Sequence, residues 1–281
     1  MIRKYVVLTL ALITLLSCAA GENAIRGYSK TDGYTYVTLG TYPQTAEGEE
    51  RPILWRVLTS DTDSAYLLSE YILFARCMNA SLKDYRDVMK GDFAQTDLCR
   101  YLNTDFADQT FTEAELAMLL PFEHYGKVFL PDVSDLKNKD YGLGETYVGK
   151  KWSDKVSQNP GLRAWGTEYA LKHNGFDPAE YPDVKKKYEG SSQKPMPLKE
   201  LRLFAYSAQW GSHSPYWTRT VSTSDKRHAR CIKAEGDIGH IEVGRDNEGV
   251  RPAVMLSLAK SEIIGGEGTK ENPYVLGGVA Q

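Results

Sequence analysis

Three arginines stand inside short runs of aromatic and β-branched residues, and these runs constrain the fold more than any other feature of the chain. They are Arg56 in Ile-Leu-Trp-Arg-Val-Leu, Arg219 in Tyr-Trp-Thr-Arg and Arg251 in Val-Arg-Pro-Ala. Such runs are typical of β-strands, where a guanidinium is costly unless carboxylates or carbonyl groups satisfy it. We therefore predict that the arginines serve packing within a sheet, with ligand contact as the alternative. The predicted structural core comprises Trp55, Arg56, Trp217, Arg219, Arg251 and Pro252.

The N-terminus has the pattern of an export signal. A basic start and a short apolar run lead into Leu-Leu-Ser-Cys-Ala-Ala, which contains Cys18. The apolar run is too short for a permanent membrane span, and the segment resembles a bacterial lipobox, whose cysteine is lipidated and becomes the first mature residue. We predict a signal peptide over 1–18, a lipid on Cys18 and a polar tether over 19–33. The alternative is simple cleavage after Ala20.

Length and charge exclude some classes of protein. The 281 residues, 42% of them hydrophobic, suit one large domain or two small ones. Without the signal peptide the chain keeps 32 basic and 37 acidic residues, a formal net charge of −5. A chain of this sign without a basic block is a poor candidate for binding nucleic acid. The cationic run at 185–187 is typical of a solvated face.

The mature chain keeps an odd number of cysteines. These are Cys77, Cys99 and Cys231. An exported protein can retain disulfides, so at least one of the three thiols is unpaired or bridges another chain. Their spacing does not select a pair, and three buried free thiols remain the alternative.

The distribution of local patterns predicts an α+β fold. Strand patterns occur at 34–39, 53–58, 65–69, 127–131, 216–220, 229–233, 240–243 and 250–256, and helical spacing occurs at 98–102, 111–120 and 167–172. The turn residues at 40–44 predict the end of the first strand, and Thr112 with Glu115 forms a capping box that opens the second helix. Helices between a β-rich front and a β-rich back are typical of α+β proteins. The polar stretch 137–215 predicts a long loop-rich segment.

Several of these motifs resemble a known family. Tyr-Pro-Gln at 42–44, Trp-Arg-Val-Leu at 55–58 and Gly-Val-Arg-Pro-Ala at 249–253 resemble a bacterial domain of unknown function. That family looks like a branch of the C-type-lectin-like fold, which is shared with formylglycine-generating enzymes. The resemblance implies one domain over 34–276, with an unmatched insertion at about 176–215. It also implies a small twisted antiparallel sheet, two helices and a loop-rich half that displays the binding surface.

The sequence gives little support for catalysis or for a metal. Copper chemistry of the formylglycine-generating type needs two neighbouring thiolates, and the cysteines do not fall where the resemblance would place such a pair. The calcium-binding signatures of true C-type lectins are absent, and the histidines at 213, 228 and 240 lack the spacing of a zinc site. We therefore predict no catalytic residue, metal or cofactor. Aromatic side chains can anchor a ligand, and the candidates are Trp165, Trp210 and Tyr206.

The function predicted from these observations is binding at the cell envelope. We expect an exported, membrane-anchored lipoprotein with a non-enzymatic binding or display domain for a glycan or protein ligand, contacted by the loops at 137–215. It would sit on the cell membrane or outer membrane, facing the periplasm or the outside. The alternatives are an enzyme of the same fold, metal-dependent or cell-wall-directed, and a purely structural surface protein.

Overall fold

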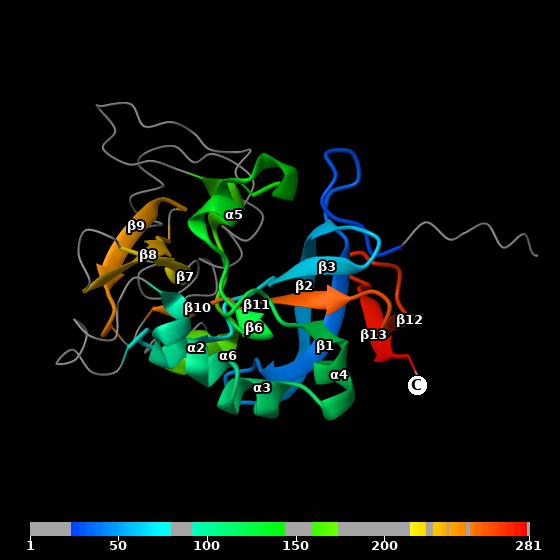
Figure 1. Cartoon of the computed structure of the whole chain (residues 1–281), viewed down its shortest axis with the longest axis horizontal. Helices are drawn as coiled ribbons and strands as arrows, with labels where there is room; N and C mark the ends of the chain where they lie inside the picture. The colour runs from blue at the N-terminus through cyan, green and yellow to red at the C-terminus, as the bar shows by residue number, and fades with distance from the viewer. Residues whose placement is uncertain are drawn as a thin grey trace, which may run out of the picture.

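Two β-sheets and a set of short helices make up the protein (Figure 1). The computed structural model describes residues 24–79, 92–143, 159–173, 214–222, 227–234, 236–245 and 248–279. One hydrophobic core extends through both sheets, since Trp55 of the larger sheet and Trp217 of the smaller one belong to the same cluster of buried side chains. The mixture of strands and helices confirms the predicted α+β class, although the sheets are more extensive than the single small sheet that the resemblance implies.

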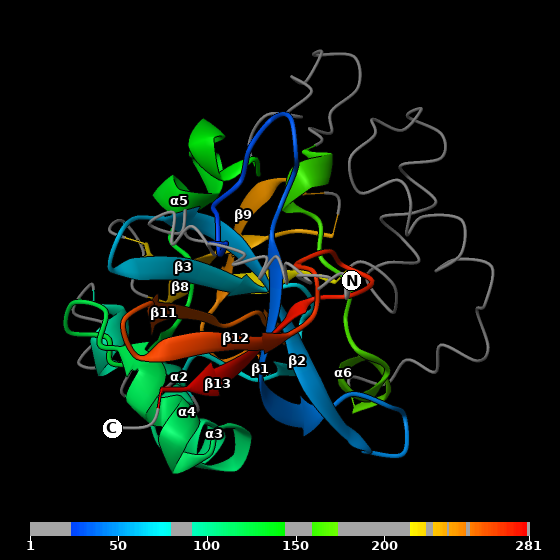
Figure 2. The ribbon, with the colours of Figure 1, turned by 90° about the vertical axis from the view of Figure 1, so that its right-hand side faces the viewer.

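The larger sheet has eight strands within the described ranges. Their order is β12-β13-β1-β2-β3-β11-β5, and β6 also pairs with β11. Neighbours are antiparallel except β13, which runs parallel to β1 (Figure 2). The strands are β1 (Tyr36–Pro43), β2 (Glu50–Ser60), β3 (Ser64–Ser69), β5 (Leu119–Leu120), β6 (Val128–Phe129), β11 (Ala253–Ser257), β12 (Ser261–Gly265) and β13 (Tyr274–Gly278).

The smaller sheet contains five strands within the same ranges. It has the order β4-β10-β7-β8-β9, in which only β10 and β7 are parallel. The strands are β4 (Phe74–Ala75), β7 (Tyr216–Val221), β8 (His228–Ile232), β9 (Ile238–Glu242) and β10 (Gly249–Val250). The predicted strand at 250–256 is therefore wrong as a single element, because its two halves belong to different sheets. Arg251 and Pro252 make the crossing between them.

Short helices surround the sheets. In the described parts of the chain they are η1 (Phe93–Gln95), α2 (Asp97–Leu102), α3 (Asp105–Thr110), α4 (Glu113–Met118), α5 (Val133–Lys137), η2 (Lys139–Tyr141), η3 (Pro160–Leu162) and α6 (Glu168–His173). The capping box of Thr112 and Glu115 is confirmed. The helix predicted over 111–120 nevertheless ends at Met118, because the next two residues pair with β11 as β5. The resemblance implies two helices, which is fewer than the described part of the chain contains.

The two faces of the larger sheet differ in chemistry. On β2, Ile53, Trp55 and Val57 are fully buried, and Trp55 stacks on Phe111 beside the helical layer formed by α3 and α4. The alternate residues, including Arg56, point to the opposite face because side chains alternate along a strand. That opposite face carries the charged groups described below.

The segment expected to be a tether and the C-terminal strands β12 and β13 both join the larger sheet. Ile25 is buried, and the backbone N–H groups of Gly27 and Tyr28 donate to Ser60 Oγ and the Leu58 carbonyl oxygen, each at 3.1 Å. From residue 24 onward the expected tether therefore packs on the domain. At the other end of the chain, β13 pairs with β1 through Val37 and Tyr274. The predicted break at 40–44 is a bulge, since β1 continues to Pro43 with Gly40 at φ 69°.

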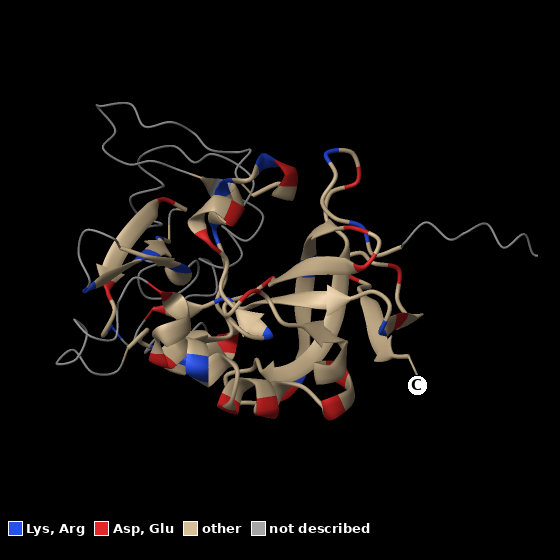
Figure 3. Ribbon diagram, in the orientation of Figure 1, with Lys and Arg blue, Asp and Glu red and all other residues tan. Residues whose placement is uncertain are grey.

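Charged residues of both signs lie mainly on helices, turns and loops (Figure 3). Acidic side chains gather in the first turns of α3 and α4, where they interact favourably with the helix dipoles. Within the described ranges, every helix is too short or too polar to cross a bilayer.

Candidate functional site

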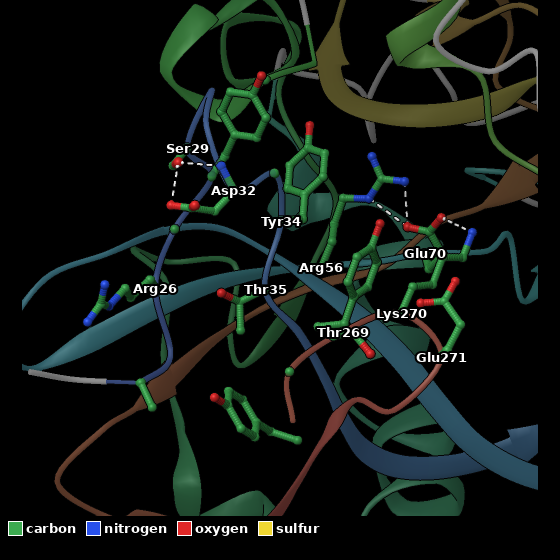
Figure 4. A pocket seen from close by; sticks show the side chains of 18 residues that line it. Arg26, Ser29, Asp32, Tyr34, Thr35, Arg56, Glu70, Thr269, Lys270 and Glu271 are labelled. Atoms are coloured by element: carbon green, nitrogen blue, oxygen red, sulfur yellow. Dashed lines mark hydrogen bonds and ion pairs between the residues drawn. The ribbon is translucent and has the colours of Figure 1, made fainter. Parts of the chain in front are cut away.

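A pocket of about 820 Å³ lies between the N-terminal segment and the loop that joins β12 to β13 (Figure 4). Residues 24–36 form one wall, and Gly268 to Glu271 form another. The floor is supplied by Arg56 on β2 and by Glu70, which follows β3. The pocket therefore forms where the two ends of the described chain meet the charged face of the larger sheet.

A tight turn shapes the N-terminal wall. The backbone N–H and carbonyl groups of Ser29 and Gly33 form two reciprocal hydrogen bonds of 2.9 and 2.8 Å. Ser29 Oγ accepts from the backbone N–H of Asp32 at 3.0 Å and donates to the Asp32 carboxylate at 3.1 Å. Gly33 has φ 79°, a left-handed conformation that strongly favours glycine. The turn folds back so that the chain returns over the pocket before β1 begins.

Tyrosine rings line the walls. The rings of Tyr28 and Tyr34 lie 4.8 Å apart, and Tyr34 also approaches Tyr36 at 6.3 Å. Two glycines permit this packing: a Cβ on Gly142 would lie 2.6 Å from the Tyr28 ring, and one on Gly268 would lie 2.4 Å from the ring of Tyr274. Aromatic faces next to hydroxyl groups offer both stacking and hydrogen bonding to a ligand.

A buried ion cluster forms the floor. Arg56 donates to the Glu70 carboxylate through Nε at 2.6 Å and through Nη2, and both side chains are at least nine-tenths buried. Lys270 reaches the other carboxylate oxygen of Glu70 at 2.9 Å and is about one-third exposed. The Arg56 guanidinium also lies over the Tyr34 ring at 4.6 Å. Glu70 thus holds one cation from the sheet and one from the loop between β12 and β13.

The protonation states of this cluster follow from burial and from neighbouring charges. Burial alone would raise the pKa of the Glu70 carboxyl, but Arg56, Lys270 and Arg251 lower it below its ordinary value. Burial also lowers the pKa of Lys270, and Glu70 more than offsets this, so that the pKa of Lys270 is raised. Burial raises the pKa of Tyr34 to about 12. At neutral pH the floor is therefore ionised, and the Tyr34 phenol is neutral.

Arg251 lies on the same face of the sheet but has different surroundings. It is fully buried, its Nε donates to the Ser69 carbonyl oxygen at 2.7 Å, and its Nη1 lies 3.4 Å from the Tyr216 hydroxyl. Among the described residues its Nη2 has no hydrogen-bond partner, and no carboxylate lies within ion-pair distance. Burial, followed by the nearby Arg56, lowers the pKa of Arg251.

The remaining predicted core residues lie in the two sheets. Trp55 and Trp217 are fully buried, and their indole N–H groups donate to the carbonyl oxygens of Leu39 and Arg76, each at 2.8 Å. Pro252 is buried beside Arg251. Arg219 on β7 pairs with Asp135 at 2.7 Å.

The aromatic residues suggested for ligand contact lie elsewhere. Trp165 is only 7% exposed, because it packs into the interior near η3 and α6. It is therefore not an exposed aromatic, and we remove it from the candidates. Trp210 and Tyr206 lie outside the described residues, as do Cys18, the insertion at 176–215 apart from its last two residues, and most of the loops at 137–215.

The cysteines and histidines show no metal centre in the described part of the chain. No disulfide joins Cys77, Cys99 and Cys231 there, and no group of three or more histidine, cysteine or acidic side chains could hold an ion. The rings of His228 and His240 lie 5.3 Å apart on neighbouring strands. Burial raises the pKa of the Cys99 thiol to about 11, which makes it a weak nucleophile at neutral pH.

Comparison with known proteins identifies the family. The model of a domain of unknown function, DUF6273, matches residues 62–258, which is more than half of the chain. The chain belongs to the DUF6273 family. No curated protein and no solved structure shows significant similarity to it. The DUF6273 region contains Glu70 and Arg251 but stops short of most of the pocket lining, which comes from residues 24–36 and 268–274.

Sequence reasoning missed this pocket for a simple reason. One wall lies largely in the segment that was interpreted as a tether, and the other lies near the end of the predicted domain, more than 200 residues away in the chain. One local signal was present. Tyr28 lies in the stretch predicted as a tether, close to the tyrosines of the predicted strand at 34–39, and aromatic residues are rare in flexible polar linkers.

Proposed function

We propose that this DUF6273 protein is an exported lipoprotein that binds a saccharide in the tyrosine-lined pocket and does not act on it catalytically. The pocket carries this proposal. It combines tyrosine rings with the charged hydrogen-bonding groups of Arg56, Glu70 and Lys270 in a concave space of about 820 Å³. Apolar walls with a few convergent polar groups are characteristic of small-molecule sites. A concave site of this size favours a small ligand over a broad protein surface.

The position of the pocket supports a role close to the membrane. Its lining begins at Ala24, only six residues after Cys18. Even a fully extended chain of six residues reaches only about 20 Å. If Cys18 carries a lipid, Ala24 at the edge of the pocket lies no farther than about this distance from the bilayer surface. A ligand in the cell envelope, at or near the membrane, would be within reach.

The proposal includes kinship with the C-type-lectin-like fold. It is supported by the α+β composition, the short helices beside a curled sheet, and the meeting of the first and last strands, β1 and β13. The parallel pairing of β13 and the separate five-stranded sheet are elaborations on the small antiparallel sheet of that fold. This part of the proposal can be tested by superposing an experimental structure of the protein on C-type-lectin-like domains. If no more than a single β-hairpin superposes, this part of the proposal is wrong.

Binding can be tested with the full-length protein in detergent on a saccharide array, followed by calorimetry on the saccharides that bind. We expect Tyr28→Ala to weaken binding at least tenfold, because it removes a wall of the pocket and the ring that packs against Tyr34. Tyr169→Ala is the matched control, since this half-buried tyrosine packs on Tyr42 and His173 away from the pocket. An array without saccharide binding, or equal losses in both variants, would refute the proposal.

The anchor has its own test. In a bacterial host fed an alkyne-tagged fatty acid, the wild-type protein should become labelled and fractionate with membranes. Cys18→Ala should lose the label and leave the membrane fraction. If the variant stays in the membrane, the lipid proposal is wrong while the pocket proposal stands.

A further inference from the structure

The strand register aligns the charged residues of the pocket floor on one face of the larger sheet. Tyr36 is paired with Arg56, Arg56 with Leu68, and Leu68 with Ala253 across β1, β2, β3 and β11. Directly paired residues point to the same side, and so do residues two positions apart. Glu70 lies two residues after Leu68, and Arg251 lies two residues before Ala253. Both therefore share the face of Arg56.

The floor holds more positive than negative charge. Arg56 and Lys270 line the pocket, and the buried Arg251 lies beneath them, outside the lining. Glu70 is the only carboxylate paired with any of these three cations in the described parts of the chain. The neighbouring phenols add no negative charge, because burial raises the pKa of Tyr34 and that of Tyr216. The formal excess is two positive charges, carried by the fully buried Arg251, the largely buried Arg56 and the partly exposed Lys270. A buried charge without an opposite partner is costly.

The charges at the rim do not cancel this excess. Asp32 and Glu271 are solvent-exposed, and the Asp32 carboxylate accepts a hydrogen bond from Ser29 Oγ. Interactions between exposed charges are weakened by water and salt, whereas those of buried groups are screened much less. The positive potential of the floor is therefore directed towards the hollow that Arg56 and Lys270 line (Figure 4).

We infer that the pocket selects saccharides that carry an oxyanion, either a carboxylate or a phosphate, next to the ring that contacts the tyrosines. This inference rests on the proposed function and names its ligand class. The anion accepts hydrogen bonds from Lys270 and from the side of the Arg56 guanidinium that faces away from Glu70, since Glu70 engages Nε and Nη2. Charge-assisted hydrogen bonds of this kind are stronger than neutral ones. Arg251 acts through its field from beneath the floor.

The test uses the full-length protein and a saccharide array in which each acidic sugar is printed beside its neutral parent. One arm carries uronic acids and the other carries sugar phosphates, so the two sources of the anion are distinguished. We expect the acidic member of a pair to bind at least tenfold more tightly than its parent. We also expect this preference to shrink when sodium chloride is raised from about 50 to 500 mM, because salt screens the attraction.

A variant assigns the preference to the floor. Lys270→Met should remove most of the preference, so that the acidic sugar and its neutral parent bind with similar affinities. Lys260→Met is the control, because this exposed lysine lies outside the pocket. Thermal unfolding checks that both variants are folded. Equal binding of acidic and neutral members would overturn the inference and leave the proposed function intact, whereas an array without any bound saccharide would overturn both.

Discussion

The sites around Arg219 and Arg251 differ in whether nearby carboxylates balance the charge of the buried guanidinium. Arg219 donates to Asp135 at 2.7 Å and to the Leu130 carbonyl oxygen at 2.8 Å, with the Phe122 ring 5.1 Å away. Asp132 lies close enough for Arg219 to help lower the pKa of its carboxyl. Around Arg251 the balance is reversed, since Arg56, Lys270 and Arg251 lie near one carboxylate, Glu70, which forms ion pairs with the first two. The balanced site is closed by aromatic rings, and the unbalanced one borders a hollow.

This difference teaches that burial of an arginine does not reveal its role. Arg219 and Arg251 come from strand-like runs of the same kind, and both are largely buried. Their distinction lies in which carboxylates the fold brings to them. A site with complete pairing needs no ligand, whereas a site with excess charge gains stability when an anion binds.

The largest effect is expected when the single carboxylate of the pocket floor is removed. Glu70→Gln leaves Arg56 and Lys270 without a negative partner, and loss of one member of a buried ion pair costs about 3–5 kcal/mol. Urea unfolding at pH 7 should show this loss of free energy. Glu271→Gln is the control, because this exposed residue at the rim should leave the stability unchanged. A loss no larger than that of the control would mean that the floor is well solvated.

The same variant has a defined pH dependence. The folded pKa of Glu70 lies below its unfolded value, so its contribution is complete above the ordinary carboxyl pKa of about 4.5 and is lost as pH falls through the folded pKa. The stability difference between wild type and Glu70→Gln should therefore be constant from pH 7 to about 5. It should shrink at lower pH.

A second unbalanced charge lies at the other end of β10, and it predicts the next largest effect. Glu248 is 2% exposed, and burial raises its pKa to about 7. Since its unfolded pKa is near 4.5, the unfolded chain loses its proton first, and stability falls as pH rises from about 4.5 to 7. At 1.36 kcal/mol per pKa unit, the loss is about 3 kcal/mol.

Glu248→Gln removes this titration. Its stability should change little between pH 5 and 8, apart from titrations that it shares with the wild type, whereas the wild type should lose about 3 kcal/mol more. Chemical unfolding of both proteins across this range measures the difference. If the two proteins have parallel curves of stability against pH, the folded protein accommodates the charge of Glu248. Arg251 would then be the remaining unbalanced charge to compare with Arg219.

The sequence predicted the elements of the fold better than their assembly. Strand-like runs located β2, β3 and β7, and the capping box located the start of α4, because these signals depend on neighbouring residues. The assignment of β10 and β11 to separate sheets could not be predicted, since Val-Arg-Pro-Ala reads as one continuous strand. The tether over 19–33 was predicted from its polar side chains. The segment nevertheless packs on the domain through backbone hydrogen bonds to β2, which side-chain polarity does not predict.

The candidate site was beyond local reasoning for the same reason. Arg56 was recognised as a buried cation in need of a partner, yet Glu70 and Lys270 carry no local mark of pairing with it. Lys270 lies 200 residues from Glu70 in the chain. The parallel pairing of β13 with β1, together with the hydrogen bond from the Tyr36 N–H to the Gly268 carbonyl oxygen, brings this loop to the floor of the pocket. The charged residues of this site come from four separate parts of the chain, so no single sequence motif could predict the excess of positive charge.

The smallest effect is expected at the balanced site, and it decides whether the comparison holds. Asp135→Asn removes the charge that faces Arg219 but leaves the Leu130 carbonyl oxygen, the aromatic rings and the nearby Asp132 in place. We expect a loss of about 2 kcal/mol, the typical contribution of a hydrogen bond to a charged group. This loss should be smaller than that of Glu70→Gln, because Arg219 keeps a second carboxylate nearby and the floor cations do not.

Urea unfolding of the two variants under identical conditions makes the comparison, with Asp140→Asn as the control on the exposed turn of η2. Double-mutant cycles with Arg219→Met and Arg56→Met then separate the pairwise term from other effects of each change. If Asp135→Asn costs as much as Glu70→Gln, a second carboxylate gives Arg219 no protection. Counting charges at each site would then not distinguish a closed structural pair from the floor of a binding pocket.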